Sequence, residues 1–135
     1  MTDAVLATLR RVNSASPFDA WAGVQLVSAA NGEAVLTLDA RADLNQHAGF
    51  LHAGLQSALV DRACGFAAAS VAGAVTTIQF QMSFYAPAAG ERFVTKARVV
   101  RAGKRQVFAT AELFSFQGNT EKLVAGGSAV LSMTS

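Results

Sequence analysis

The sequence has few charged residues, a single cysteine and no long uninterrupted apolar run. Charged residues make up 15% of its 135 residues and hydrophobic residues 52%, a balance that supports a sizeable core and argues against disorder. The net charge of +2 gives by itself no reason to expect a nucleic-acid partner. We therefore expect one globular domain over residues 1–135, without a linker.

The cysteine and the missing apolar run bear on location. Cys64 has no second cysteine with which to form an internal disulfide, which favours a reducing compartment. The first residues have neither the charge order nor the length of a secretory signal. The most apolar stretch, residues 53–75, contains Asp61 and Arg62 and so lacks the roughly 20 uninterrupted apolar residues of a membrane span. We expect a cytoplasmic protein with no membrane or nucleic-acid partner.

The spacing of apolar residues changes along the chain and predicts its elements. Residues 52–71 are rich in Ala and Leu and apolar on almost every side, which predicts a buried helix. Before it, Asn31-Gly32 is typical of a tight turn between two strands. After it, an alternation with a period of two starts at Thr76 and stops at Pro87. The other expected elements are a short helix over about 3–13 and strands over 24–28, 34–39, 76–85, 93–100, 106–116 and 122–131.

This order of elements predicts an α+β fold. Two strands come first, then the buried helix, then a meander of four strands. One helix packed against an antiparallel sheet is a common layer design. We expect about six long strands to curl around the helix.

Asp61 and Arg62 are the only charged residues of the predicted helix. Neighbours in sequence point about 100° apart, so the two do not pair across one helix face. An ionised carboxylate among small apolar residues needs hydrogen bonds or a cleft. A structural alternative is that Asp61 simply lies on a partly exposed turn of the helix or forms an ion pair with an arginine. The residues expected on its face are small: Gly54, Ser57, Ala58, Cys64, Gly65 and Ala68.

The start of the same helix offers a second chemical feature. It opens at His52-Ala53-Gly54, and its first backbone N–H groups have no partner within the helix. Such a terminus suits a carbonyl oxygen that gains negative charge during a reaction. Ala53 and Asp61 are eight residues apart, or roughly 12 Å at about 1.5 Å per residue, too far to reach one carbonyl carbon. If both take part, two antiparallel helices from different subunits must lie side by side, which implies at least a dimer.

The sequence resembles a known family at these positions. The run QHAGFLHAG at 46–54, followed by LVD at 59–61, is similar to the signature of hotdog-fold thioesterases of the phenylacetate-degradation (PaaI-like) type. The resemblance extends over most of the chain from about Val24 and includes Tyr85-Ala86-Pro87 and the hairpin at 100–105. It implies a hotdog fold, in which a curved sheet wraps a long central helix. The implied activity is hydrolysis of an acyl-CoA or aryl-acyl-CoA thioester to a free acid and CoA.

The resemblance also implies a role for individual residues. Asp61 stands where the family has its catalytic Asp or Glu, a general base on water or a nucleophile. Ala53 stands where the family usually has a Gly whose backbone N–H polarises the thioester carbonyl; alanine keeps that N–H but narrows the room for acyl groups. Gln46 stands where Asn or Gln orients water or substrate, and Thr77 where a hydroxyl assists near the carboxylate. Gln46 and Ala53 would come from one subunit, and Asp61 and Thr77 from its partner. We therefore expect a homodimer at minimum, and a homotetramer formed as a dimer of dimers.

The remaining candidates have a structural and a functional interpretation each. His52, next to Ala53 and Gly54, either tunes the site or caps the helix. Two histidines without a nearby cysteine or paired carboxylates make a poor metal site, so we expect no metal and no cofactor. Cys64 has no histidine near it in sequence and is expected in the core. Four cations around one hairpin form either a clamp for the phosphates of CoA or a solvated surface: Arg98, Arg101, Lys104 and Arg105.

Two other functions stay open at this point. A hotdog hydratase or dehydratase acting on enoyl thioesters needs a histidine and a carboxylate at the second and third carbons of the substrate. His52 is the one candidate, and it lies beside the oxyanion donor instead of opposite Asp61. A non-catalytic acyl-CoA-binding module predicts tight binding without turnover and gives no reason for a carboxylate opposite a helix terminus.

Overall fold

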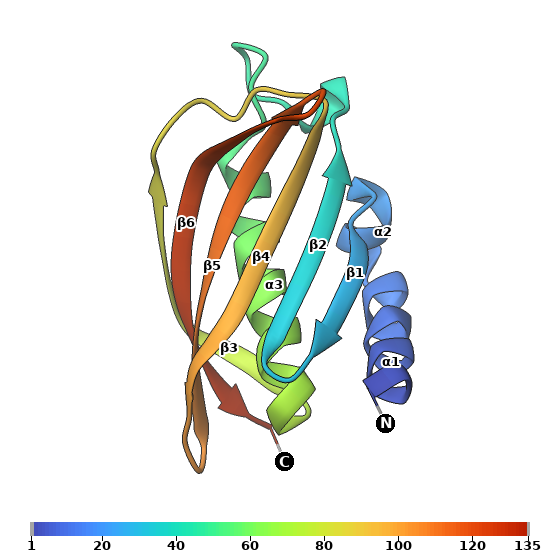
Figure 1. Ribbon diagram of the computed structural model, residues 1–135, viewed down its shortest axis with the longest axis vertical. Coiled ribbons are helices and arrows are strands. Elements are labelled where there is room, and N and C mark those ends of the chain that lie inside the picture. Colours follow the sequence, from blue (N-terminus) through green and yellow to red (C-terminus); the bar gives the residue numbers. More distant parts are fainter. Residues whose placement is uncertain (1, 135) are drawn as a thin grey trace.

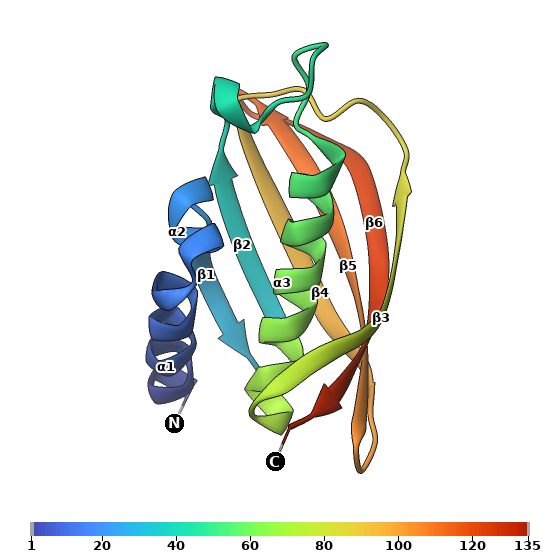
Figure 2. The same cartoon turned by 180° about the vertical axis from the view of Figure 1, so that it is seen from behind.

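A long helix, α3 (Ala53–Ala72), lies in the hollow of a curved six-stranded antiparallel sheet (Figure 1, Figure 2). The computed structural model describes residues 2–134, with side chains from residue 4 onward. It confirms the predicted α+β arrangement and the curved sheet of about six strands around a central helix. The strands are β1 (Gln25–Ala30), β2 (Glu33–Asp39), β3 (Val75–Phe84), β4 (Arg92–Ala102), β5 (Gln106–Gln117) and β6 (Thr120–Met133).

The strands lie in the order β1-β2-β4-β5-β6-β3, so β3 is an edge strand that pairs with β6. The expected meander of four strands is therefore wrong in one respect: β4, β5 and β6 form a meander, but β3 does not pair with β4. The segment 85–91 passes over one end of the sheet to connect β3 with β4 (Figure 1). Apolar alternation indicates which side chains face the core, but it does not indicate which strands are neighbours.

The hairpin between β1 and β2 follows the turn chemistry expected from the sequence. Asn31 and Gly32 have φ values of 55° and 80°, and the flanking residues Ala30 and Glu33 pair across the turn. Positive φ at both central residues is typical of the two-residue turn that matches the twist of a hairpin. The turn fixes the register of β1 and β2, and both strands contact α3.

The two sides of α3 differ in burial. Leu59 and Val60, on the core side, are 1% and 0% exposed. The opposite side is partly open and carries Asp61. Two residues expected beside Asp61 are instead completely buried, Cys64 and Ala68. At about 100° per residue, Cys64 is turned by about 60° from Asp61 toward the buried Val60, whereas Ala68 lies almost directly above Asp61, so the open side of α3 ends before it. The other small residues predicted for the face of Asp61 lie at the open side or its margin: Gly54, Ser57, Ala58 and Gly65.

The N-terminal helix α1 (Thr2–Ala15) lies beside β1 (Figure 1). The guanidinium of Arg10 donates hydrogen bonds of 3.1 and 3.0 Å to the carbonyls of Leu26 and Val27. The buried amide of Asn13 donates a 2.9 Å bond to the carbonyl of Val24. These bonds to β1 and to the residue before it fix α1 in place at the edge of the fold. No helix within residues 2–134 is both long enough and apolar enough to cross a membrane.

A second short helix, α2 (Pro17–Ala22), follows α1 and was not predicted from the sequence. Ser16 caps it, with its Oγ accepting a 3.4 Å hydrogen bond from the N–H of Asp19. Pro17 occupies the first helical position, where its missing N–H group is tolerated. The Ser-Pro pair therefore starts the second helix.

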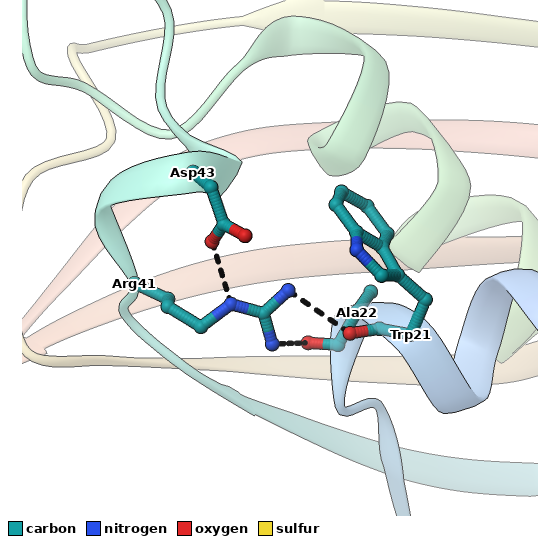
Figure 3. Close-up of polar contacts among 4 residues, drawn as sticks. All are labelled: Trp21, Ala22, Arg41 and Asp43. Carbon is teal, nitrogen blue, oxygen red and sulfur yellow. Dashed lines mark hydrogen bonds and ion pairs between the residues drawn. The ribbon is translucent and has the colours of Figure 1, made fainter.

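Arg41 holds the C-terminal end of α2 (Figure 3). Its guanidinium donates hydrogen bonds of 2.9 and 3.5 Å to the carbonyls of Trp21 and Ala22, and it forms a 2.6 Å ion pair with Asp43. The hydrogen bond from Arg41 lowers the pKa of the Asp43 carboxyl. Asp43 belongs to a single turn of 3₁₀-helix (Ala42–Leu44), so these bonds connect α2 to the segment that leads toward α3.

Candidate active site

Asp61 lies half-buried near the middle of α3, and Thr77 lies on β3 beside it. The Oγ1 of Thr77 donates a 2.6 Å hydrogen bond to Oδ1 of Asp61. The two residues are brought together because the chain turns back after Gly73 and β3 crosses the helix at its open side (Figure 2). A hydroxyl bond to a carboxylate is short and fixes the orientation of the acid. Within residues 4–134 the second oxygen, Oδ2, accepts no hydrogen bond, which leaves it free to accept one.

Arg62, the neighbour of Asp61, points to a different partner. Its Nε donates a 2.8 Å hydrogen bond to Oδ2 of Asp19, a side chain of α2 that is 1% exposed. Its guanidinium also lies 4.7 Å from the centre of the Phe66 ring. No cation within residues 4–134 forms an ion pair with Asp61. The structural alternative in which Asp61 forms an ion pair with an arginine therefore does not hold within residues 4–134.

The start of α3 is capped by His52. Its Nδ1 accepts a 2.8 Å hydrogen bond from the N–H of Gly54, and its carbonyl accepts the N–H of Gln56 at 3.0 Å. An Nδ1 that accepts a hydrogen bond carries no proton, so the ring proton sits on Nε2. The N–H of Ala53 donates to no acceptor within the described residues. The helix terminus therefore presents the Ala53 N–H for an incoming acceptor.

Gln46 closes the loop that precedes α3. Its side-chain oxygen accepts hydrogen bonds from the N–H groups of Ala48 and of Phe50, the latter at 3.4 Å. Its backbone N–H donates to the carbonyl of Phe50 at 2.8 Å. The oxygen of Gln46 is thus occupied by its own loop, and the amide Nε2 is the group left to meet a ligand.

The candidate residues lie in two separate groups within one chain, which we call half-sites. Asp61 and Thr77 make one of them, in direct contact with each other. The other surrounds the helix start, and it comprises Gln46, His52, Ala53 and Gly54. Because α3 is one continuous helix from Ala53 to Ala72, Ala53 and Asp61 stay about 12 Å apart. The structure does not bring the two half-sites together within a single chain.

The four cations of the β4–β5 hairpin are exposed and do not form one cluster. Arg98 alternates with the buried Ala97, so it lies on the face of the sheet opposite α3. Arg101 pairs with Phe108 on the neighbouring strand, while Lys104 and Arg105 lie in the turn itself. The turn is attached to the end of β6, where the N–H of Met133 donates to the carbonyl of Arg105 at 2.9 Å.

Cys64 is completely buried one turn after Asp61, as expected for a core residue. Burial raises the pKa of its thiol to about 12, and the negative charge of Asp61 acts in the same direction. A thiol that stays protonated is neither a nucleophile nor a metal ligand. Within residues 2–134, no three side chains of His, Cys, Asp or Glu come close enough to share a metal ion.

The Asp19–Arg62 ion pair was not predicted from the sequence. The two residues are 43 positions apart, and neither lies in a motif that signals the other. The one local signal was the Ser16-Pro17 pair, which begins α2 and so determines where Asp19 lies. The pair matters for the site because it removes the positive charge of Arg62 from the neighbourhood of Asp61.

Comparisons with known proteins give the family. A model of the thioesterase superfamily matches residues 48–122. A thioesterase family protein from Silicibacter pomeroyi is 34% identical, with 95% of this chain and 96% of that chain covered and a TM-score of 0.91. A conserved protein from Pseudomonas aeruginosa is 28% identical, with coverages of 92% and 98% and a TM-score of 0.83.

The fold is also that of a more distant protein. The PaaI protein from the phenylacetic acid degradation operon of E. coli is 21% identical, with coverages of 99% and 96% and a TM-score of 0.89. None of the curated proteins matches the sequence. The chain belongs to the thioesterase superfamily and has the hotdog fold of PaaI, as the sequence resemblance predicted.

Proposed function

We propose that the protein is an acyl-CoA thioesterase in which Asp61 activates the attacking water. The observation that carries this proposal is the carboxylate itself, which is fixed by Thr77 through one oxygen and carries no salt bridge within residues 4–134. A charge that contributes no ion pair and lies at the open side of a packed helix needs another explanation. Membership of the thioesterase superfamily supports hydrolysis of a thioester as that explanation.

The reaction divides between two groups. Oδ2 of Asp61 takes a proton from water, whose oxygen attacks the carbonyl carbon of the thioester. Negative charge moves to the carbonyl oxygen, where the N–H of the partner's Ala53 stabilises it, an effect worth about 3–4 kcal/mol for donors of this kind. The C–S bond then breaks, the thiolate of CoA takes the proton from Asp61, and the free acid leaves. We favour this route over direct attack by Asp61, because Thr77 and the amide Nε2 of Gln46 are suited to hold a water molecule.

The proposed site is completed by a second copy of the chain. The separation of about 12 Å between Ala53 and Asp61 requires it. Small residues along the open side of α3, such as Ala58, permit a second helix to approach. The edge strand β3 and the residue after it expose large apolar side chains: Ile78 is 52%, Phe84 49% and Tyr85 60% exposed. We propose a homodimer with antiparallel α3 helices, which can pair further into a homotetramer.

The basic hairpin supports CoA as the thiol component. Lys104 and Arg105 lie in the turn, next to the end of β6, which pairs with the part of β3 that carries Thr77. Cations so placed are suited to phosphates at the mouth of the site. Arg101 extends the same edge, whereas Arg98 on the outer face is the weakest candidate. With its one cysteine buried, we place the protein in a reducing compartment, the cytoplasm.

The hydratase alternative is less well supported than hydrolysis. A hydratase needs a histidine that exchanges protons with the substrate, and because Nδ1 of His52 caps the N–H of Gly54, only Nε2 is left for that role. In the proposed dimer the partner's helix start would bring His52 to Asp61 together with the Ala53 N–H, on the side of the oxyanion donor and not opposite to it. His52 therefore acts, in our proposal, by holding the helix terminus in the geometry that presents the Ala53 N–H.

The direct test is the variant Asp61→Asn. Asparagine has nearly the same shape, and its carbonyl oxygen can still accept the hydrogen bond from Thr77. We expect thiol release from acyl-CoA to fall by roughly 10²–10⁴-fold, as on loss of a general base, while substrate binding persists. Asp43→Asn, a change at an exposed aspartate in the Arg41 pair, is the matched control and should keep full activity. Undiminished hydrolysis by Asp61→Asn would sink the proposal.

A further inference from the structure

A cleft of about 540 Å³ separates α1 from the C-terminal half of α3. Pockets for small molecules commonly have volumes of about 300–1,000 Å³ and are mostly apolar. This cleft fits both criteria, because its volume lies within that range and its walls are largely aliphatic. From α1 it is lined by Val5, Thr8 and Val12, and from α3 by Gly65, Phe66 and Ala69.

The cleft begins next to the Asp61–Thr77 half-site. Gly65, in its wall, is one helical turn after Asp61, or about 6 Å along the axis. Val75, at its end, is two residues before Thr77 on β3. A thioester carbonyl that meets Asp61 can therefore extend its acyl group along α3 into the cleft.

The charge of the cleft selects for neutral groups. Arg62 is the one charged residue among the lining residues that the structure describes. Its guanidinium is already paired with the buried Asp19 at 2.8 Å and lies against the ring of Phe66. An acyl group that ended in a carboxylate would meet a guanidinium whose Nε is bonded to Asp19 and whose Nη2 is buried, whereas an apolar group would only displace water.

The wall formed by α1 is held in a fixed position. Arg10 and Asn13 bind α1 to carbonyls of Leu26, Val27 and Val24, on the side away from the cleft. On the cleft side, Val5 is 36% and Val12 49% exposed, which leaves apolar surface for a ligand to cover. A fixed apolar wall discriminates between ligands by shape and size.

We propose that this cleft receives the acyl group of the thioester and that α1 determines which acyl groups fit. The acyl groups it accepts are neutral, apolar and much larger than acetyl, either straight-chain or aromatic. This inference rests on the proposed thioesterase function, and it assigns to α1 a role in substrate selection that neither Asp61 nor the helix terminus supplies.

The test fills the cleft from α1 without touching the half-sites. Thr8→Trp places an indole in the cleft, and Ala7→Trp places the same ring on an exposed position of α1 that does not line it. For each protein, kcat/KM is measured with acetyl-, hexanoyl- and benzoyl-CoA. We expect Thr8→Trp to lower the ratio of hexanoyl to acetyl hydrolysis, and of benzoyl to acetyl, by at least about tenfold. Ala7→Trp should keep both ratios of the wild type.

A second variant of α1 and a charged substrate extend the test. Val12→Ala removes bulk from the same wall and should raise the ratio of benzoyl to acetyl hydrolysis, which keeps the test valid if Thr8→Trp does not fold. With the wild type, hexanoyl-CoA should be hydrolysed at least about tenfold better than adipoyl-CoA, which has the same length and a terminal carboxylate. Light scattering of each variant reports the mass of the assembly in solution.

The outcomes separate the cleft from the reaction. If Thr8→Trp and Val12→Ala hydrolyse the thioesters as well as the wild type does, with unchanged hexanoyl-to-acetyl and benzoyl-to-acetyl ratios, the assignment of the cleft is overturned. The thioesterase function stays intact in that case. A lower assembly mass for Thr8→Trp alone would show that a second chain occupies the cleft, which also overturns it. A wild type that hydrolyses none of the thioesters would overturn the proposed function and this inference together. Equal rates with hexanoyl- and adipoyl-CoA would remove the preference for neutral groups.

Discussion

On one side of α3, Leu59 and Val60 are 1% and 0% exposed in the core, and on the other side Asp61 faces a partly open surface of small residues. The first side provides the apolar burial that stabilises the fold. The second provides a fixed carboxylate, room for a second helix and the wall of a cleft. The difference shows how one helix can be apolar almost all round without being buried all round, and the side left open is the one that our proposals assign to a partner and a ligand.

The largest effect on stability is expected on the core side. Leu59→Ala removes a side chain that is 1% exposed, and its loss should lower the free energy of unfolding by about 2–5 kcal/mol. Urea denaturation followed by circular dichroism measures this change. A loss below about 1 kcal/mol would mean that this side of the helix is not packed as described.

The pH dependence of stability reports on the same core side through Cys64. Its pKa is raised from 9.0 to about 12 by burial, so the folded state keeps the thiol proton where the unfolded state loses it. The contribution of Cys64 to stability is complete below pH 9 and is lost as the pH rises toward 12. The loss should approach about 1.4 kcal/mol per pH unit in that range.

The comparison that isolates this contribution uses Cys64→Ala. The free energy of unfolding of the wild type should fall more steeply between pH 9 and 10 than that of the variant. Identical slopes would contradict the burial of the thiol. Reaction with a thiol reagent at pH 8 gives a second readout, since it should occur only after unfolding.

The smallest effect is expected on the open side. A Cβ at Gly65 would meet only the Cδ2 of Leu131, at 3.9 Å, so Gly65→Ala introduces no clash within the chain. Alanine favours a helix interior over glycine, and the free energy of unfolding should rise by up to about 1 kcal/mol. The same urea titration measures it. A clear loss of stability would show that the partner helix packs tightly against Gly65, which would bring the dimer contact further along α3 than we propose.

The positions of the helices and strands were predicted from the sequence better than the pairing of the strands. The helix expected over 52–71 is found at Ala53–Ala72, and the Asn31-Gly32 turn has the positive φ values of its type, because both depend on local chemistry. The pairing of β3 with β6 was missed, since the choice of a neighbour depends on how the whole chain crosses the sheet. Periodic patterns carry no such information.

The candidate site shows the same division. Thr77 and Asp61, both named from the family resemblance, lie in contact, and their catalytic roles stay a prediction. The small residues beside Asp61 were only partly predicted, because Cys64 lies within one turn of it yet faces the core. The Asp19–Arg62 pair was not predicted at all, because 43 residues separate two charges that meet only after α2 docks on α3.

The central claim, that each site combines Asp61 of one chain with the Ala53 N–H of another, can be tested by mixing two inactive variants. Asp61→Asn lacks the carboxylate. Ala53→Pro lacks only the N–H, since proline suits the first position of a helix and the backbone of His52, with φ −59° and ψ 139°, suits a residue before proline. Each homodimer should be nearly inactive.

After the two variants are unfolded and refolded together, about half of the dimers are mixed, and each mixed dimer holds one intact site of two in the symmetric assembly. Thiol release should therefore recover to about a quarter of the wild-type value. If Asp61 and Ala53 acted within the same chain, mixing would restore no activity, and that result would contradict the account.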